Sequence, residues 1–536
     1  MAGVKKTSIE RAEFPEKAGV SSEGIAGFID DLKKSKIETH SLMILRNGKV
    51  AFESWAEPYG PDIPHTMYSV SKSFTSTAVG FAVEEGLLTL ETRILDIFPE
   101  HTPAKKDENL EKLTIFHLLT MTAGKDVSVL ADKTKNRWIE DFFEAKWKFA
   151  PGESWRYVNE NIYMLCAALV KLTGMSVIEY LTPRLFEPLG FGRKPFWETD
   201  PNGVEAGGWG LFITTEELAK FSLCYLNNGV FDGKQVIPEN WAREAVKKQA
   251  DNNRNSPDGS SGYGFCFWRN GCPDTYRSDG MFSQFGIVFE KLNAVLVITA
   301  SEISEQKVRN CIWRHFPAAF TDTDALPTAD FPAVKPSLAP LQELKVSRRS
   351  PYEKIIAGRK IVVDKPMLLP IAKLPLSMLP VSILYMSADK AGNINNVSFE
   401  FGDNECYMSW DEGEEHNTIA CGLDGKPRLS PIRLAGINFT ASSTASWKNE
   451  KTLSVWMRPL ESISQRRVDV IFKGFHADLI FSSSPDTKNI LRSLASNVED
   501  YVSNPFAVKT VKKVMLNAYK IVEPPLSGKL VKIDQA

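Results

Sequence analysis

The sequence lacks the features that mark membrane, secreted and nucleic-acid-binding proteins. Its 536 residues contain no run near the roughly 18 apolar residues of a membrane span, and the first residues, MAGVKKTSIERAEFPEKAG, lack the apolar core of a secretory signal. The 64 Lys and Arg residues are balanced by 66 Asp and Glu, so no basic excess exists to attract nucleic acid or an anionic membrane. We therefore expect a cytoplasmic protein that binds neither nucleic acid nor membranes.

Cysteine and histidine are also scarce, with seven residues of each. The cysteines never show the CxxC spacing of zinc and redox sites, and most stand in apolar runs, which is typical of buried thiols. No His-Glu-x-x-His motif occurs, and the histidines have no Ser-His-Asp context. His65, four residues before Ser69, is interpreted as structural. We predict neither a metal ion nor a cofactor.

The first part of the chain predicts one antiparallel sheet built from segments far apart in the sequence. In SLMILRNGKVAFESW, Asn47-Gly48 stands between two apolar runs, which indicates a hairpin. A second group of strands is expected at about residues 262–301, and the chain between the two groups is mainly helical. The segment EQKVRNCIWRHFPAAF is expected to be a closing helix against the sheet. This pattern favours an α/β (α+β) domain in which an antiparallel sheet is flanked by helices and carries a helical insertion.

Prolines interrupt the pattern from about residue 316 to 351, which indicates a linker. Beyond it apolar residues alternate with a period of two, and such alternation is typical of strands. We predict a first domain over residues 1–318, a linker over 319–350 and a β-rich domain over 351–536, either a barrel or a sandwich, with a helical tail from about residue 486.

The stretch SVSKSFTSTAVGFAVEEG places Ser69 and Lys72 on one turn at the start of a predicted helix that Gly86 ends. A lysine amine that loses its proton can activate a neighbouring serine, and burial beside a helix N-terminus favours that loss. The motif alone is weak, because Ser304-x-x-Lys307 matches it too, and a serine at this position also suits a helix cap.

Two further stretches present polar groups suited to the same chemistry. Tyr157 and Asn159 stand two residues apart just before an amphipathic helix, so one could relay a proton and the other orient an amide. Ser278-Asp279-Gly280 ends a predicted strand, where the glycine allows a ligand to approach the backbone. A hairpin turn is the alternative interpretation of the latter.

Taken in order, Ser69-x-x-Lys72, Tyr157-x-Asn159 and Ser278-Asp279-Gly280 resemble the motifs of the serine β-lactamase and penicillin-binding protein superfamily. The phrases ILRNGKVAFE, LTIFHLLTMTAG and PGESWRYVNENIYMLCAALVKLTG also look like that family, most closely its class C type and the esterase and amide-hydrolase relatives. The likeness covers about residues 14–318. The β-rich domain resembles, more loosely, the barrel-like C-terminal domains of some D-aminopeptidase relatives.

The resemblance implies a role for each site residue. Ser69 is the acylated nucleophile, Lys72 takes its proton, and Tyr157 is the second proton carrier. Asn159, Ser278 and Gly280 contact the substrate, and the backbone N–H groups of Ser69 and Met281 form the oxyanion hole. Relatives often carry lysine or histidine at the position of Ser278, so we expect neutral substrates to be preferred here.

We therefore expect a serine hydrolase that cleaves a small ester or amide through an acyl-enzyme. Two alternatives stay open: a D-aminopeptidase or DD-peptidase-like activity, and a non-catalytic protein that keeps the fold while its β domain engages a partner. The oligomeric state is not predictable from the sequence.

Overall fold

The computed structural model describes residues 8–105, 107–126, 136–252, 254, 256–321, 336–341, 346, 348–364, 377–380, 383, 391–496 and 505–533. The chain forms two compact units, residues 1–339 and 340–536. The division falls within the predicted linker. Because much of residues 319–350 lies outside the described residues, the linker and the exact domain boundaries stay predictions.

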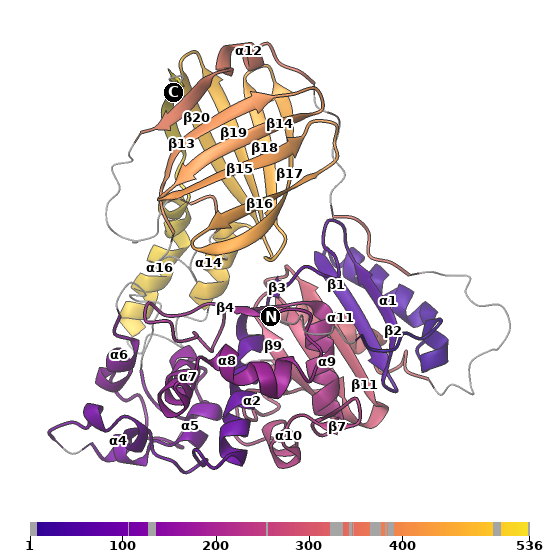
Figure 1. The fold of residues 1–536 in the computed structure, drawn as a ribbon, viewed down its shortest axis with the longest axis vertical. Helices are drawn as coiled ribbons and strands as arrows, with labels where there is room; N and C mark the ends of the chain where they lie inside the picture. Colours follow the sequence, from indigo (N-terminus) through magenta and orange to yellow (C-terminus); the bar gives the residue numbers. More distant parts are fainter. Residues whose placement is uncertain are drawn as a thin grey trace. The chain divides into compact units, whose positions relative to one another are not determined.

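The first unit is built on an antiparallel sheet whose strands come from both ends of the unit, as predicted (Figure 1). The strands run in the order β2-β1-β11-β10-β9-β8. Their bounds are β1 (Thr39–Arg46), β2 (Lys49–Trp55), β8 (Trp268–Arg269), β9 (Thr275–Gly280), β10 (Gln284–Phe289) and β11 (Ala294–Ala300). The predicted hairpin is confirmed, with Asn47 and Gly48 both at positive φ between β1 and β2.

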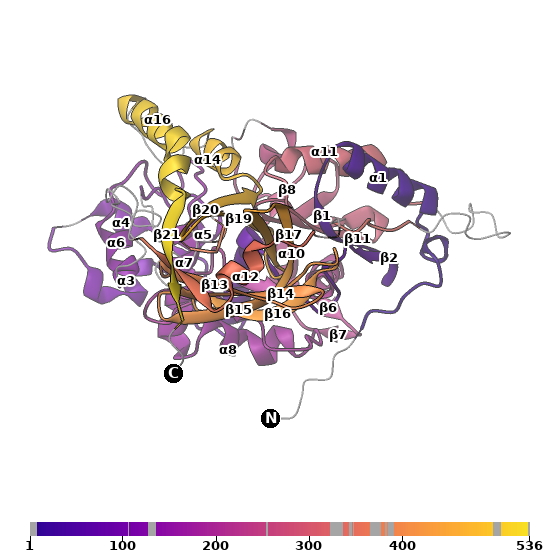
Figure 2. The same ribbon diagram turned by 90° about the horizontal axis from the view of Figure 1, so that it is seen from above.

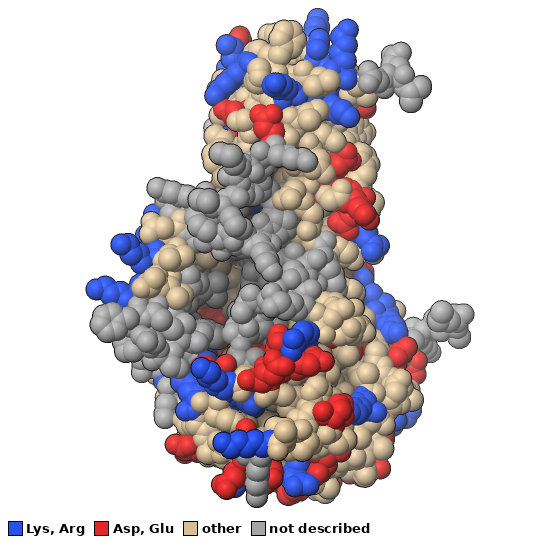
Figure 3. Space-filling model, turned by 90° about the vertical axis from the view of Figure 1, so that its left-hand side faces the viewer, with Lys and Arg blue, Asp and Glu red and all other residues tan. Residues whose placement is uncertain are grey.

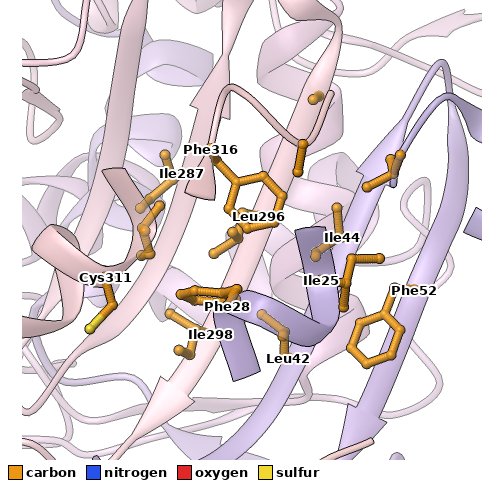
Figure 4. Packing of buried hydrophobic residues seen from close by; sticks show 14 of the residues in the cluster. Ile25, Phe28, Leu42, Ile44, Phe52, Ile287, Leu296, Ile298, Cys311 and Phe316 are labelled. Atoms are coloured by element: carbon orange, nitrogen blue, oxygen red, sulfur yellow. The ribbon is translucent and has the colours of Figure 1, made fainter. Parts of the chain in front are cut away.

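Helices α1 (Ser22–Lys34) and α11 (Glu305–His315) lie side by side on one face of this sheet (Figures 1 and 2). Helix α11 is the predicted closing helix. Phe28 of α1 and Phe316 meet edge to face, 5.4 Å between ring centres, among Leu42 of β1 and Ile298 of β11 (Figure 4). Both rings are fully buried, and truncating such a ring to alanine typically costs about 3–5 kcal/mol. This core holds together strands that are distant in sequence.

The insertion between the two groups of strands is mainly helical. Its longest helices are α2, α7 and α9, and α9 lies against β1, β10 and β11 on the face opposite α1. The helices are α2 (Ser71–Glu84), α3 (Ile94–Ile97), α4 (Glu108–Lys112), α5 (Ile115–Leu119), α6 (Trp138–Glu144), α7 (Asn159–Thr173), α8 (Val177–Leu181), α9 (Thr215–Leu226) and α10 (Glu239–Ala245). The predicted helix stop at Gly86 is confirmed, because α2 ends just before this left-handed glycine.

Short elements complete the unit. The small strands are β3 (His65–Thr66), β4 (Phe196–Trp197), β5 (Leu211–Ile213), β6 (Val230–Phe231) and β7 (Lys234–Gln235). Single helical turns are η1 (Pro15–Ala18), η2 (Tyr68–Val70), η3 (Pro99–His101), η5 (Thr182–Phe186), η6 (Pro257–Gly259) and η7 (Glu290–Leu292). Strand β5 pairs with β3 and β4, which ties the segment before Ser69 to a loop about 145 residues later.

The second unit is a β-barrel. Of the two forms predicted for it, a barrel or a sandwich, the barrel is therefore the correct one. Its sheet runs β15-β14-β13-β12-β21-β20-β19-β18-β17-β16. The outer strands β15 and β16 meet through the Asn417 side chain, which donates to the carbonyl of Arg433 and accepts from its N–H, both at 2.8 Å. The strands are β12 (Arg359–Val363), β13 (Ile394–Phe401), β14 (Glu405–Glu412), β15 (Glu415–Gly422), β16 (Arg428–Leu434), β17 (Ile437–Asn449), β18 (Thr452–Pro459), β19 (Gln465–Lys473), β20 (His476–Ser484) and β21 (Leu526–Lys532).

The helices of this unit are α12 (Tyr352–Ile356), α14 (Thr487–Ser496) and α16 (Pro505–Val522). The last two confirm the predicted helices after residue 486, but the tail also contains a strand that was not predicted. The chain returns to the barrel as β21, which pairs with β12 and β20. This strand spans only seven residues, and its buried alternate positions are Leu526, Gly528 and Leu530, so the sequence holds only a short alternating pattern with a glycine in it.

Among the described residues no single helix is long and apolar enough to cross a membrane, whereas α7 and the segment Val177–Phe186, bent by 73°, reach that length and apolarity together. On the face drawn in Figure 3, Lys and Arg side chains lie among Asp and Glu side chains over the described surface. This mixture matches the small net charge of the sequence.

Candidate active site

Ser69 lies in a tight turn that leads into helix α2. The residue before it, Tyr68, has a φ of 46°, a left-handed conformation that is unfavourable for a bulky side chain. The Ser71 hydroxyl stabilises this turn, because it donates to the Tyr68 carbonyl at 2.6 Å and accepts from the N–H of Leu211 at 3.1 Å. Helix α2 has Val70 at its N-cap position, so Ser69 is not the helix cap that its sequence position also allowed.

Lys72 lies in the first turn of α2, and its side chain is buried. Its Nζ is 3.0 Å from Ser69 Oγ, 2.7 Å from Asn159 Oδ1 and 2.6 Å from the carbonyl oxygen of Gly208. Burial lowers the pKa of Lys72 to about 7, so near neutral pH much of the amine is uncharged. Two of its hydrogens then fit the two carbonyl oxygens, and the lone pair is left to face Ser69.

Tyr157 precedes α7, and its phenol lies close to the Ser69 side chain. Burial raises the pKa of Tyr157 well above its ordinary value, and the interaction with Ser69 opposes part of that rise. The phenol therefore keeps its proton and can act as a donor. Lys72 Nζ lies 4.6 Å from the centre of its ring, so the predicted nucleophile and both predicted proton carriers lie together.

Asn159 is the first residue of α7, and its side chain contacts Lys72 directly. Its side-chain oxygen is already engaged by the amine. The predicted contact with a substrate amide therefore falls to its NH₂ group, and this role stays a prediction.

The third motif lies at the end of β9, and its side chains alternate as predicted. Arg277 and its cross-strand partner Ile287 share the face that packs on α1 and α11, whereas Ser278 lies opposite Gly286 on the α9 face. Arg277 is paired with Asp279 at 2.5 Å. The Ser278 hydroxyl is buried and faces the Gly286 carbonyl at 3.5 Å, and its contact with substrate stays a prediction.

Gly280 occupies a close approach between β9 and the turn that carries Ser69. A Cβ atom at this position would come within 2.3 Å of the Met67 carbonyl oxygen, which only glycine avoids. Met281 follows immediately, so the predicted second oxyanion donor stands beside the Ser69 turn. Its role as an oxyanion donor stays a prediction.

Two groups that the fold brings to the site were not predicted from the sequence. The Gly208 carbonyl on Lys72 comes from the run AGGWG, whose glycines were a usable sign of close backbone packing. Arg254 lies 5.4 Å from the ring centre of Tyr157 and 5.6 Å from that of Trp268, and its charge lowers the pKa of both Lys72 and Tyr157. Nothing local in the sequence indicates that Arg254 lies there.

The remaining predictions concern histidine, cysteine and metal. His65 is buried, with its Nε2 3.0 Å from His40 Nδ1 and its Nδ1 3.0 Å from the Thr66 carbonyl, which fits the structural role predicted for it. All seven cysteines are free, and all but Cys272 are buried, as predicted. Within the described residues no group of three or more His, Cys, Asp or Glu side chains is arranged to hold a metal ion.

Comparisons with known proteins agree with the family resemblance of the sequence. The chain is 21% identical over 249 residues to the 6-aminohexanoate-dimer hydrolase of Paenarthrobacter ureafaciens, covering 43% of this chain and 64% of that protein. It is 24% identical over 218 residues to a beta-lactamase of Escherichia coli, covering 35% and 57%. These alignments thus span less than two thirds of each relative.

A putative 6-aminohexanoate-dimer hydrolase structure from Bacillus anthracis aligns with 59% of this chain and 88% of its own, at 20% identity and a TM-score of 0.48. The sequence pattern of the Beta-lactamase family matches residues 25–314. Because that match covers more than half of the 536 residues, the chain belongs to the beta-lactamase family of serine hydrolases.

Proposed function

We propose that this protein cleaves a small ester or amide through an acyl-enzyme on Ser69. The observation that carries the proposal is the placement of Lys72 Nζ, which lies between two carbonyl acceptors and within hydrogen-bond distance of Ser69 Oγ. A buried amine with a pKa of about 7 is suited to accept a proton at neutral pH. The family membership supports the same reaction class.

In the proposed first half-reaction, Lys72 accepts the hydroxyl proton as Ser69 Oγ forms a bond to the substrate carbonyl carbon. The negative charge moves to the former carbonyl oxygen, which the N–H groups of Ser69 and Met281 are expected to stabilise. Tyr157 donates its proton to the leaving oxygen or nitrogen as that bond breaks, and it recovers a proton from the Lys72 ammonium. An acyl-enzyme and a free alcohol or amine result.

In the second half-reaction, water attacks the acyl carbon and loses its proton to the basic group beside Ser69. The ester bond to Oγ breaks, Oγ regains a proton, and a carboxylic acid leaves. Both half-reactions use the same three side chains, and neither requires a metal or an organic cofactor.

The substrate class follows from the third motif. Because Ser278 stands where relatives often carry a cation, we propose that neutral acyl groups are preferred. We also propose a cytoplasmic location. A D-aminopeptidase or DD-peptidase-like activity is the second catalytic alternative, and a non-catalytic binding protein is the alternative from another class.

Labelling with a fluorophosphonate, followed by mapping of the modified residue by mass spectrometry, tests the proposal. We expect one adduct, on Ser69, that is lost in Ser69→Ala. Ser76→Ala is the matched control, because this hydroxyl lies on the same helix, is buried and has no hydrogen-bond partner among the described residues. Labelling elsewhere would contradict the mechanism, and no labelling of a folded protein would favour the binding protein.

A further inference from the structure

The turn between β9 and β10 holds two residues in an unfavourable backbone conformation. Phe282 has a φ of 62° and Ser283 a φ of 74°, the left-handed region that favours glycine. Two successive non-glycine residues in this region persist only where the surrounding structure holds them. The turn directly follows Gly280 and Met281, at the end of the strand that lines the site.

The buried side chain of Gln284 holds this turn. Its Nε2 lies 3.2 Å from the Met281 carbonyl, 3.1 Å from the Phe282 carbonyl and 2.8 Å from the Ala300 carbonyl. Its Oε1 accepts from the N–H of Ala300 at 3.3 Å. The amide thus links the turn to the end of β11. An isolated buried amide would be costly, so these contacts bind the turn and Gln284 into one unit.

The turn also contacts the segment that carries the nucleophile. The Phe282 ring meets the Tyr68 ring edge to face, 5.2 Å between centres, and Tyr68 is the strained residue immediately before Ser69. Gly280 lies against the Met67 carbonyl on the same segment. The two strained turns therefore face each other at the site.

We propose that Gln284 is a positioning residue that sets the direction of the Met281 N–H toward the oxyanion. The peptide before Met281 is held by the pairing of Gly280 with Gln284 in the sheet, and the peptide after it is held by the Gln284 side chain through the Met281 carbonyl. The N–H therefore lies between two restrained peptide planes. A donor placed in this way costs no reorganisation when the negative charge develops. The inference rests on the proposed acyl-enzyme function.

If Gln284 positions an oxyanion donor, its loss should weaken stabilisation of the transition state and leave substrate binding nearly unchanged. Gln284→Met keeps the length of the side chain and removes all its hydrogen bonds. We expect kcat for a nitrophenyl ester to fall about tenfold to a thousandfold, in the range seen when one oxyanion donor is lost, with KM changed less than about threefold. Affinity for an aryl boronic acid, which forms a tetrahedral adduct on the serine, should fall in parallel with kcat.

Two further variants distinguish positioning from a merely structural role. Thr299→Val removes a buried hydrogen bond between β11 and Ser41 without touching the turn, so kcat and boronate affinity should stay near the wild-type values. In the double variant Gln284→Met with Ser283→Gly, the glycine relieves backbone strain. We expect the double variant to recover the thermal stability lost in Gln284→Met but not its kcat. If Gln284→Met alone fails to fold, kcat and boronate affinity are measured on the double variant instead.

Three results would overturn the inference: folded Gln284→Met with wild-type kcat and boronate affinity, an effect on KM alone, or recovery of kcat together with stability in the double variant. If wild-type protein neither hydrolyses esters nor binds the boronic acid, the proposed function itself fails, and this outcome is separate from the first three.

Discussion

The side-chain oxygen of Asn159 accepts a hydrogen bond of 2.7 Å from Lys72 Nζ, although 87 residues separate the two in the chain. This contact and the Gly208 carbonyl occupy two directions around the nitrogen and leave the third toward Ser69. This position suits Lys72 to the role of base that we propose for it. The predictions below test that arrangement and its surroundings.

Removal of the proposed nucleophile or of the proposed base should abolish most of the activity. We expect Ser69→Ala and Lys72→Ala to lower kcat/KM for an activated aryl ester by about a thousandfold or more, because each removes a group that takes part in bond making. Circular dichroism should show that both variants fold. Ser76→Ala should keep wild-type turnover, and undiminished turnover in Ser69→Ala would refute the assignment.

Activity should rise with pH through about 7, because Lys72 must be uncharged to accept the proton and its pKa lies near 7. The positive charge of Arg254 lowers that pKa, so Arg254→Met should raise it and move the rising limb of kcat/KM to higher pH. Arg243→Met, which removes an exposed arginine paired with Glu239, is the control and should leave the limb in place. A limb that moves to lower pH in Arg254→Met would contradict this electrostatic account.

Neutral esters should be better substrates than anionic β-lactams. A charge-assisted hydrogen bond to a carboxylate contributes about 1.5–3 kcal/mol, so its absence at Ser278 should cost about tenfold to a hundredfold in selectivity. The measurement compares kcat/KM for nitrophenyl butyrate with that for a chromogenic cephalosporin. Equal kcat/KM for the two substrates would contradict the prediction. If the cephalosporin were then no longer turned over by Arg254→Met, that arginine would be identified as the cation that binds the carboxylate.

Acid should destabilise the first unit partly through His65. Burial lowers the pKa of His65 to about 3, below the ordinary value of about 6.5 expected in the unfolded chain. Between these values the unfolded state binds the extra proton, so the free energy of unfolding falls as pH decreases, by up to about 1.4 kcal/mol per unit. Urea unfolding of wild type and His65→Asn at pH 4.5 to 7.5 should show a smaller pH dependence in the variant. An equal slope in both proteins would show that His65 does not govern this loss.

The first unit should fold without the second. Residues 1–339 form a compact unit with their own core, so the fragment should unfold cooperatively on heating. Differential scanning calorimetry of the fragment and of the full chain measures this directly. Absence of a cooperative transition in the fragment would mean that the barrel is needed for folding.

Much of the site could be predicted from sequence because its first two members depend on local geometry. Residues three apart on a helical turn share a face, and the turn Tyr68–Val70 leads directly into α2, so Ser69 and Lys72 were expected to lie together from local sequence. The hairpin at Asn47-Gly48 and the start of α7 after Tyr157 are equally local. The alternation in the last third of the chain likewise predicted strands, since period two reflects the backbone of each strand by itself.

Long-range packing decided the rest. The contacts of Lys72 with Asn159 and Gly208, the place of Arg254 beside Tyr157, and the hold of Gln284 on the strained turn depend on which distant segments meet. The same is true of the burial of Ser278 against Gly286, the closure of the barrel at Asn417, and the return of the chain as β21. A residue type and its sequence neighbours determine the local conformation. A buried polar group needs a hydrogen-bond partner because it has lost its contacts with water, and which residue becomes that partner depends on how distant segments pack in the core.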